Sequence, residues 1–203
     1  MDTNFNHEQS LTLINEMIQR AQNNVKKGKT YATILMGYVV AAAAVTQCVL
    51  IHTLKNPNQS FLIWLVIIPT VVAGLFIERR DKREKMVKTH IDKIGDMVWV
   101  GYGIASFVFL AVLFTVLFRL ETSAIFQLAT PVVLIMLGML QFILSCTFRR
   151  KIWYLYAACY WGGAVTCAFL SADVHLIVFA VCILLGFVMP GHILIHQIKK
   201  SHV

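Results

Sequence analysis

Hydrophobic residues are gathered into six long blocks, separated by short polar segments. Each block is close to or longer than the roughly 17–25 residues that an α-helix needs to cross the hydrocarbon core of a bilayer. No Asp, Glu, Lys or Arg falls in the middle of any block. Because backbone amides in lipid must be satisfied within their own segment, such blocks predict helices. We therefore predict an all-α polytopic membrane protein with six transmembrane helices, at about 31–54, 61–77, 97–118, 124–148, 152–170 and 174–195.

The polar segments divide the chain into three parts. Residues 1–30 are predicted to form a cytoplasmic amphipathic helix, residues 31–195 the transmembrane domain, and residues 196–203 a basic tail. The first apolar block exceeds the roughly 7–15 residues of a signal-peptide core, so we expect it to remain as a membrane-spanning helix. Residues 78–96, between the second and third spans, are predicted to form a basic helical connection.

Charge is distributed unequally between the two sides of the predicted spans. The chain is 58% hydrophobic and only 14% charged, with 18 Lys and Arg residues and a formal net charge of +8. All the cations except Lys55 and Arg119 fall on the side that holds both termini. Cytoplasmic segments retain Lys and Arg, so we predict three helical hairpins with both termini in the cytoplasm. We therefore predict that the protein is a multi-pass protein of the cytoplasmic (inner) membrane.

The stretch "FIERRDKREKMVK" at 76–88 is the most basic part of the chain. A nucleic-acid site would place aromatic or base-reading residues among the cations, but 78–96 contains no aromatic residue. We therefore expect no nucleic-acid partner. Cations in this position attract anionic lipid headgroups by about 1 kcal/mol each. Arg79, Arg80 and Arg83 are the candidates for such interactions or for contact with a protein.

Two cytoplasmic segments carry an apolar stripe at helical spacing. The N-terminal stripe contains Ile14 and Ile18, and the second runs along the connection from Val87 to Val98. Such stripes either lie in the membrane interface or pack on another helix. Under the first interpretation they cap the bundle. Under the second they pair with each other, with a second copy or with a protein partner, and Ile14 and Ile18 are the interaction candidates.

Small residues at four-residue spacing occur in the three odd-numbered spans. Small-x-x-x-small pairs let helix backbones approach closely in lipid. We therefore predict that the odd-numbered helices lie inside the bundle and that the even-numbered ones are more exposed to lipid. The predicted helix-packing pairs are Gly37 and Ala41, Gly101 and Ala105, and Ala158 and Gly162.

The amphipathic N-terminal segment is followed in order by "GKTYATILMGYVV", "TPVVLIMLGMLQFILS", "YLYAACYWGGAVTCAFL" and a last helix with a Pro-Gly close in "LLGFVMPGHIL". This order of segments resembles that of a family of small bacterial six-helix integral membrane proteins of uncharacterised function. It implies the same fold, but that family supplies no active-site residues to transfer.

Few residues in the spans suggest chemistry. Gln47 and Gln141 are deep inside their spans and either bond across helices or line a solute path. The five cysteines have the pattern of buried apolar residues, with no metal or disulfide motif. His192 and His196 share a helix face and could hold a metal, although we favour two histidines at the membrane interface. We therefore expect no cofactor.

The sequence thus favours a non-enzymatic regulatory, scaffolding or accessory component of the membrane. The alternative hypothesis is a small transporter or channel for a neutral or apolar solute, with Gln47 and Gln141 along its path.

Overall fold

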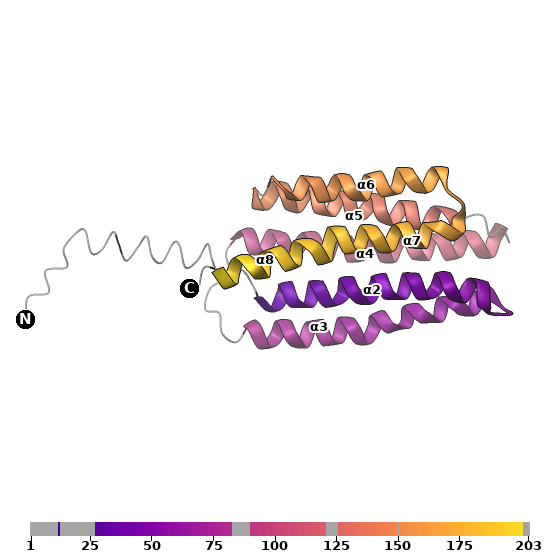
Figure 1. Ribbon diagram of the computed structural model, residues 1–203, viewed down its shortest axis with the longest axis horizontal. Coiled ribbons are helices and arrows are strands. Elements are labelled where there is room, and N and C mark those ends of the chain that lie inside the picture. Colours follow the sequence, from indigo (N-terminus) through magenta and orange to yellow (C-terminus); the bar gives the residue numbers. More distant parts are fainter. Residues whose placement is uncertain (1–11, 13–26, 83–89, 121–125, 150, 201–203) are drawn as a thin grey trace, which may run out of the picture.

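The computed structural model describes residues 27–82, 90–120, 126–149 and 151–200, together with Thr12. Within these ranges all regular structure is helical, as predicted, and no strand occurs. Figure 1 shows long helices lying side by side. Their bounds are α2 (Lys27–Thr53), η1 (Pro57–Val66), α3 (Ile67–Lys82), α4 (His90–Leu120), α5 (Phe126–Phe148), α6 (Trp153–Phe169), α7 (Ala172–Ile183), η3 (Leu184–Val188) and α8 (Met189–Lys200).

Two of the long rods are made of more than one kind of helix. The 3₁₀-helix η1 continues directly into α3 because Ile67 has helical dihedral angles. The last rod runs from α7 through η3 into α8, and η3 is a π-helix in which the Met189 N–H donates to the Leu184 carbonyl. A π-turn adds one residue to a helical turn and widens it. Gly186 lies within this segment, where the wide turn meets another helix.

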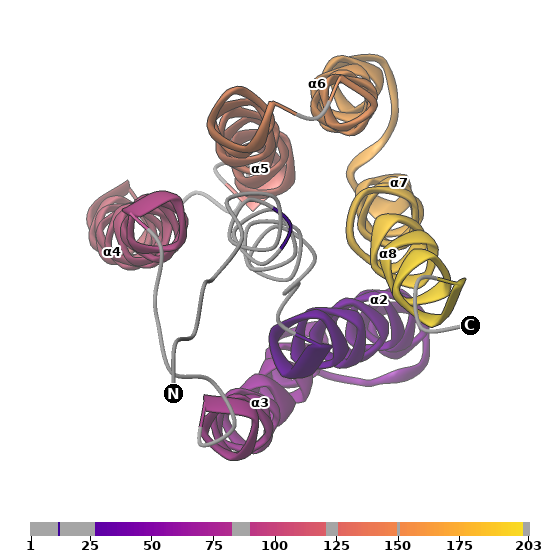
Figure 2. The ribbon, with the colours of Figure 1, turned by 90° about the vertical axis from the view of Figure 1, so that its left-hand side faces the viewer.

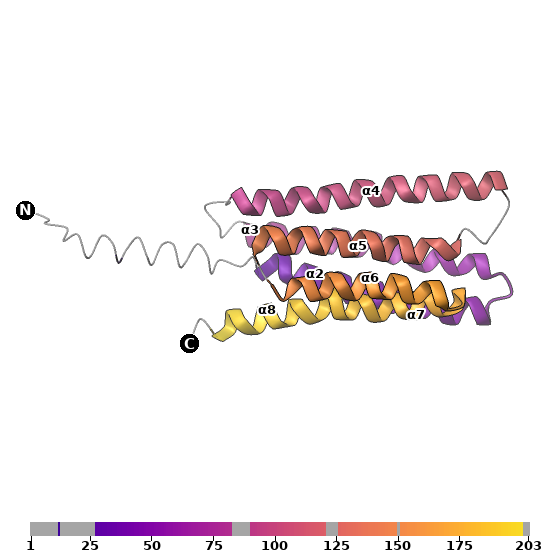
Figure 3. The ribbon, with the colours of Figure 1, turned by 90° about the horizontal axis from the view of Figure 1, so that it is seen from above.

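Successive rods run in opposite directions and form three hairpins (Figures 1 and 3). At one end of the bundle α2 begins, α3 ends, α4 begins, α5 ends, α6 begins and α8 ends. We call this the basic end, because it carries the exposed side chains of Arg79, Lys93, Arg149 and Lys151. Residues 1–11 and 13–26, which include the predicted amphipathic stripe, lie outside the described residues.

Five rods are long and apolar enough to cross a membrane, which indicates a membrane-embedded protein. The remaining predicted crossing, the fifth along the chain at 152–170, corresponds to α6, which is 17 residues long and runs beside α5 (Figure 1). The predicted spans match these helices to within a few residues. The five helical spans are Thr30–Thr53, Gln59–Ile77, Lys93–Val116, Gln127–Phe148 and Ala172–His196.

Viewed from the basic end, the rods form an open arc in the order α4, α5, α6, α7–α8, α2 and α3 (Figure 2). Neighbours along the arc pack on each other. The two helices at its ends, α3 and α4, make no contact through the part of the chain that the structure describes. Among the described helices, one side of the arc is therefore open.

Burial corrects the prediction that the odd-numbered helices are inside. The spans of α5 and of α7–α8 are each 39% buried, whereas that of α4, the third predicted helix, is only 6% buried. The predicted interior position holds for α2 and is wrong for α4. The reason is that α4 is apolar on all sides, and in lipid such a helix gives no sequence signal for which face, if any, turns inward.

Candidate functional site

Only the first of the predicted helix-packing pairs lies at a helix interface. Gly37 is buried, and a Cβ atom at this position would stand 2.8 Å from Val188 Cγ2 and 3.3 Å from Phe187 Cβ. Ala41 is also buried. The missing side chain therefore lets α2 approach the π-helix closely, as small-residue packing requires. Gly37 and Ala41 therefore lie on the face of α2 that is turned toward the rest of the bundle.

The other two pairs do not lie at the helix–helix contacts that the sequence argument predicted for them. Gly101, Ala105, Ala158 and Gly162 are exposed, and a Cβ atom at either glycine would meet no atom within 4 Å. Four-residue spacing shows that two small residues share a face, but it does not show which way that face points. In α6 the buried face is instead made by Tyr156, Ala157, Tyr160, Gly163, Ala164 and Cys167.

Three of the closest contacts in the core involve glycines that the sequence argument did not select. A Cβ atom at Gly163 would overlap Cys182 Sγ, one at Gly186 would overlap the Tyr160 ring, and one at Gly138 would overlap the Trp161 indole. Each neighbour comes from a different helix, far along the chain. No local spacing rule identifies such positions, because the partner side chain decides them.

Gln47 makes a hydrogen bond between helices. Its Oε1 atom accepts a hydrogen bond from Trp64 Nε1 at 2.6 Å, and the glutamine is buried. The Trp64 ring packs edge-on against Phe179, with ring centroids 6.3 Å apart. The contact therefore ties α2, η1 and α7 together. This is the structural role that one of the two interpretations of Gln47 predicted.

Replacing Gln47 with Leu should lower the free energy of unfolding by about 1 kcal/mol, because the Trp64 N–H loses its acceptor in apolar surroundings. Thermal melting in detergent measures the effect. Gln59→Leu, at an exposed position of η1, is the matched control and should have little effect. If Gln47→Leu and Trp64→Phe lower stability additively in the double mutant, the hydrogen bond makes no contribution of its own.

Gln141 is also buried, but it lies far from Gln47. It is near the basic end of α5, whereas Gln47 is near the opposite end of α2. Within the described residues α2 and α5 are not in contact. The two glutamine side chains are therefore not in contact, and they do not form one continuous polar surface.

Aromatic rings from α4, α6 and η3 meet at mid-height of the bundle. Phe187 lies between Tyr160, at 5.9 Å, and Trp99, at 5.7 Å, measured between ring centroids. Tyr160 is fully buried. Its hydroxyl oxygen has no hydrogen-bond partner among the residues that the structure describes. A buried hydroxyl without a partner costs stability, and this one lies against Gly186 of the π-helix.

His192, near the basic end, contacts a tyrosine of α2. His192 Nε2 lies 3.1 Å from Tyr38 Oη, and His196 is exposed. No group of three His, Cys, Asp or Glu side chains capable of holding a metal was found among the described residues. The five cysteines are all free thiols. His192 therefore joins α8 to α2 through Tyr38.

The predicted cytoplasmic interaction residues are described only in part. Arg79 is exposed near the end of α3. Arg80 belongs to the same helix, but its side chain is not described. Ile14, Ile18 and Arg83 lie outside the described residues. Their predicted role therefore stays a prediction.

The candidate functional site is the exposed face of α4 that contains Gly101 and Ala105. This helix is 31 residues long. Among the described residues its backbone lies close only to that of α5, where a Cβ atom at Gly95 would stand 3.1 Å from Phe148 Cζ, and its Trp99 ring also contacts Phe187 of η3. The small residues of α4 are turned away from these contacts and are exposed. A flat helix surface without side-chain bulk lets another helix approach closely in lipid.

Comparisons with known protein families, with curated proteins and with solved structures find no match to the chain. The family resemblance noted in the sequence therefore stays a prediction.

Proposed function

We propose that the protein is a non-enzymatic accessory component of a bacterial inner membrane, with six spans and both termini in the cytoplasm. Its exposed α4 face would bind a transmembrane helix of another membrane protein. The proposal of cytoplasmic termini rests on the charge asymmetry, because Lys and Arg are retained on the cytoplasmic side. In addition to the five helices that are long and apolar enough to span, α6 would be the fifth crossing along the chain, and its 17 residues cover about 25 Å at 1.5 Å per residue.

The observation that carries the proposal is the weak integration of α4 into the bundle. Only 6% of its span is buried, although the helix contains the small pair Gly101 and Ala105. Glycine contributes almost no packing against lipid, whereas at a helix–helix contact it permits close approach and good van der Waals packing. A partner helix at this face would give the small pair a structural role.

The alternative of a solute path receives less support from the geometry. A conducting path needs polar groups that follow one another through the membrane. Gln47 is bonded to Trp64, and Gln141 lies on a helix that does not contact α2 within the described residues. The accessory role therefore remains the preferred function.

A photocrosslinking amino acid at Ala105 tests the proposed site in native membranes. We expect a crosslink to another membrane protein, and we expect Gly101→Leu to abolish it because the added side chain keeps a helix at a distance. The melting temperature should not change, since a Cβ atom at Gly101 meets nothing within 4 Å.

Gly103→Leu is the matched control on the same helix. Gly103 also has open space around it, but it lies about 200° away around the helix axis. The crosslink should survive this change. A crosslink only to lipid would contradict the proposal. A crosslink between two copies of the chain would mean that this face of α4 binds a second copy of the protein and not another membrane protein.

A further inference from the structure

A proline interrupts the backbone hydrogen bonding of the last rod in the middle of its span. In an α-helix the Leu185 carbonyl accepts a hydrogen bond from the N–H of residue 189. Here the Met189 N–H donates to the Leu184 carbonyl, because the segment is a π-helix. The donor that a π-helix offers Leu185 is residue 190, but this is Pro190, which has no N–H. The Leu185 carbonyl therefore has neither of its helical donors.

This carbonyl lies deep in the span and on an exposed face of the rod. Leu185 is near the middle of Ala172–His196, more than about 15 Å from either end at 1.5 Å per residue. The carbonyl of a helical residue points toward the next turn, so it lies between the side chains of Leu185 and Met189, which are 42% and 50% exposed. Val181, one turn earlier, is 49% exposed. A hydrogen-bond acceptor is therefore turned toward the middle of the bilayer.

The surroundings of the carbonyl supply no donor in its place. The exposed side chains next to it, Val181, Leu185 and Met189, are apolar. The side-chain hydrogen bonds found in the described parts of α6 and α7 end on other atoms. An unsatisfied backbone group in the hydrocarbon region costs several kcal/mol, so membrane proteins cover such groups with protein or place them in a wet cavity. The Leu185 carbonyl therefore calls for a donor from outside the chain.

The depth and chemistry of this face decide which donor fits. Lipid acyl chains have no donor, and lipid headgroups lie at the two ends of the span. A bound water molecule needs about two to four polar partners, whereas one carbonyl among apolar side chains offers a single partner. A second copy packed through the same face would present Ile177, Val181, Leu184 and Met189, which have no donor either. A transmembrane helix with one polar side chain at mid-depth supplies the missing hydrogen bond.

We propose that the face of α7–α8 formed by Val181, Leu185 and Met189 binds a transmembrane helix of another membrane protein. A hydroxyl, amide or indole side chain of that helix donates a hydrogen bond to the Leu185 carbonyl. Helical side chains lean toward the preceding turn, so Met189 covers the carbonyl in the free protein, and a flexible methionine adapts to an incoming helix. The inference requires α7–α8 to be in the membrane, but it does not depend on a partner helix at Gly101.

Energy transfer in phosphatidylcholine vesicles tests the proposal with the full chain and two synthetic helices. Both probes are oligoleucine transmembrane helices. One has glutamine at its centre, and the other has methionine, which is similar in size and has no N–H or O–H donor. We expect the glutamine helix to bind about fivefold more tightly, the lower end of what a hydrogen bond between helices contributes in model peptides. Equal affinities of the wild-type protein for the two helices would overturn the proposal.

Substitution of the proline supplies the decisive comparison. Pro190→Ala restores an N–H that pairs with the Leu185 carbonyl within the helix, so the preference for the glutamine helix should disappear. Pro131→Ala, which removes the proline inside α5, is the matched control and should retain the preference. Gly101→Leu should retain it as well, which separates this face from the α4 face. A preference that survives Pro190→Ala would contradict the inference, and melting temperatures verify that each variant is folded.

The carbonyl itself can be observed by NMR, because the chain contains two Leu-Gly pairs, Leu137-Gly138 and Leu185-Gly186. Leucine labelled with ¹³C at the carbonyl and glycine labelled with ¹⁵N therefore give two signals in a ¹⁵N-filtered spectrum. Leu137 belongs to the α-helix α5 and is the internal reference. An accepted hydrogen bond deshields a carbonyl carbon, so the glutamine helix should move the Leu185 signal to higher chemical shift and leave the reference in place. An unmoved Leu185 signal would mean that the carbonyl already has a donor, such as a bound water molecule, and would overturn the inference.

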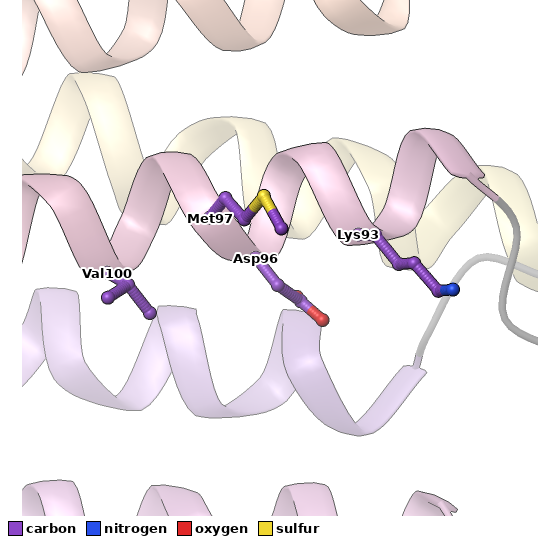
Figure 4. Close-up of a pocket in the computed structure, with 4 residues that line it drawn as sticks. All are labelled: Lys93, Asp96, Met97 and Val100. Atoms are coloured by element: carbon purple, nitrogen blue, oxygen red, sulfur yellow. The ribbon is translucent and has the colours of Figure 1, made fainter.

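A photocrosslinking residue at Met189 locates the bound helix in the same vesicles. We expect an adduct with the centre of the glutamine helix and a lower yield with the methionine helix. Met97 is the control site, since it is another exposed methionine but lies on α4, where it lines an open depression with Lys93 and Asp96 (Figure 4). At that site the two helices should give equal, low yields. An adduct at Met189 only with lipid or with a second copy would overturn the proposal.

Discussion

Gly163→Leu should unfold the bundle, whereas Gly162→Leu, at the preceding residue, should leave its stability nearly unchanged. Gly163 is buried where α6 meets α7, and a Cβ atom there would overlap Cys182 Sγ. Overpacking a closely packed core typically costs 1–3 kcal/mol and occasionally more. A leucine, which is much larger than the methyl group that already overlaps, should cost about 3 kcal/mol or more.

The neighbouring glycine provides a control of identical chemistry. Gly162 is exposed, and a Cβ atom there meets nothing within 4 Å. Gly162→Leu also replaces a poor helix former by a good one, which offsets small losses. Thermal melting in one detergent compares the two variants. If they melt at the same temperature, or if Gly162→Leu melts lower, α6 presents a different face to α7 from the one described.

This pair shows what could be predicted from sequence and what could not. The spans follow from length and composition, because the bilayer requires about twenty apolar residues whatever surrounds the helix. The predicted ends therefore fall close to those of Thr30–Thr53 and Gln127–Phe148. The rotation of each helix about its axis has no such constraint in lipid, since both its faces are apolar. The sequence argument selected Gly162 as the packing glycine of α6, whereas Gly163 is the buried one. The helix was therefore located correctly, but its rotation about its own axis was predicted wrongly.

The same limit explains the misplaced third helix. In water, an amphipathic pattern reveals which face of a helix is buried, because the exposed face is polar. Around α4 nearly every side chain is apolar, including Val100 and Phe107 on the exposed side. Gly101 and Ala105 suggested an interior position, but the same pattern suits a contact outside the bundle. The sequence contains the small pair, and only the packing shows that the other described helices do not cover it.

Gln47 was recognised from sequence, but its partner was not. A deep glutamine in lipid predicts a hydrogen bond, since leaving its amide unsatisfied is costly. Trp64 supplies the donor from the second span, and nothing in their spacing identifies that pairing. The sequence analysis did not select Tyr160, because its burial depends on the π-helix that packs on it around Gly186.

Tyr160→Phe should stabilise the protein. The side chain is fully buried, and its hydroxyl oxygen has no hydrogen-bond partner within the described residues. Phenylalanine keeps the ring that packs on Phe187 and removes a group whose desolvation is uncompensated. Relief of such a penalty should raise the free energy of unfolding by about 1–3 kcal/mol. For a chain of this size, each kcal/mol raises the melting temperature by about 2–4 °C.

Tyr38→Phe is the control that separates a satisfied hydroxyl from an unsatisfied one. Tyr38 Oη lies 3.1 Å from His192 Nε2, so its removal should lower stability by about 0.5–1.5 kcal/mol. Thermal melting of both variants in the same detergent should therefore shift the midpoint in opposite directions. A lower melting temperature for Tyr160→Phe would mean that the hydroxyl has a partner in the membrane, such as a bound water molecule between α6 and the π-helix.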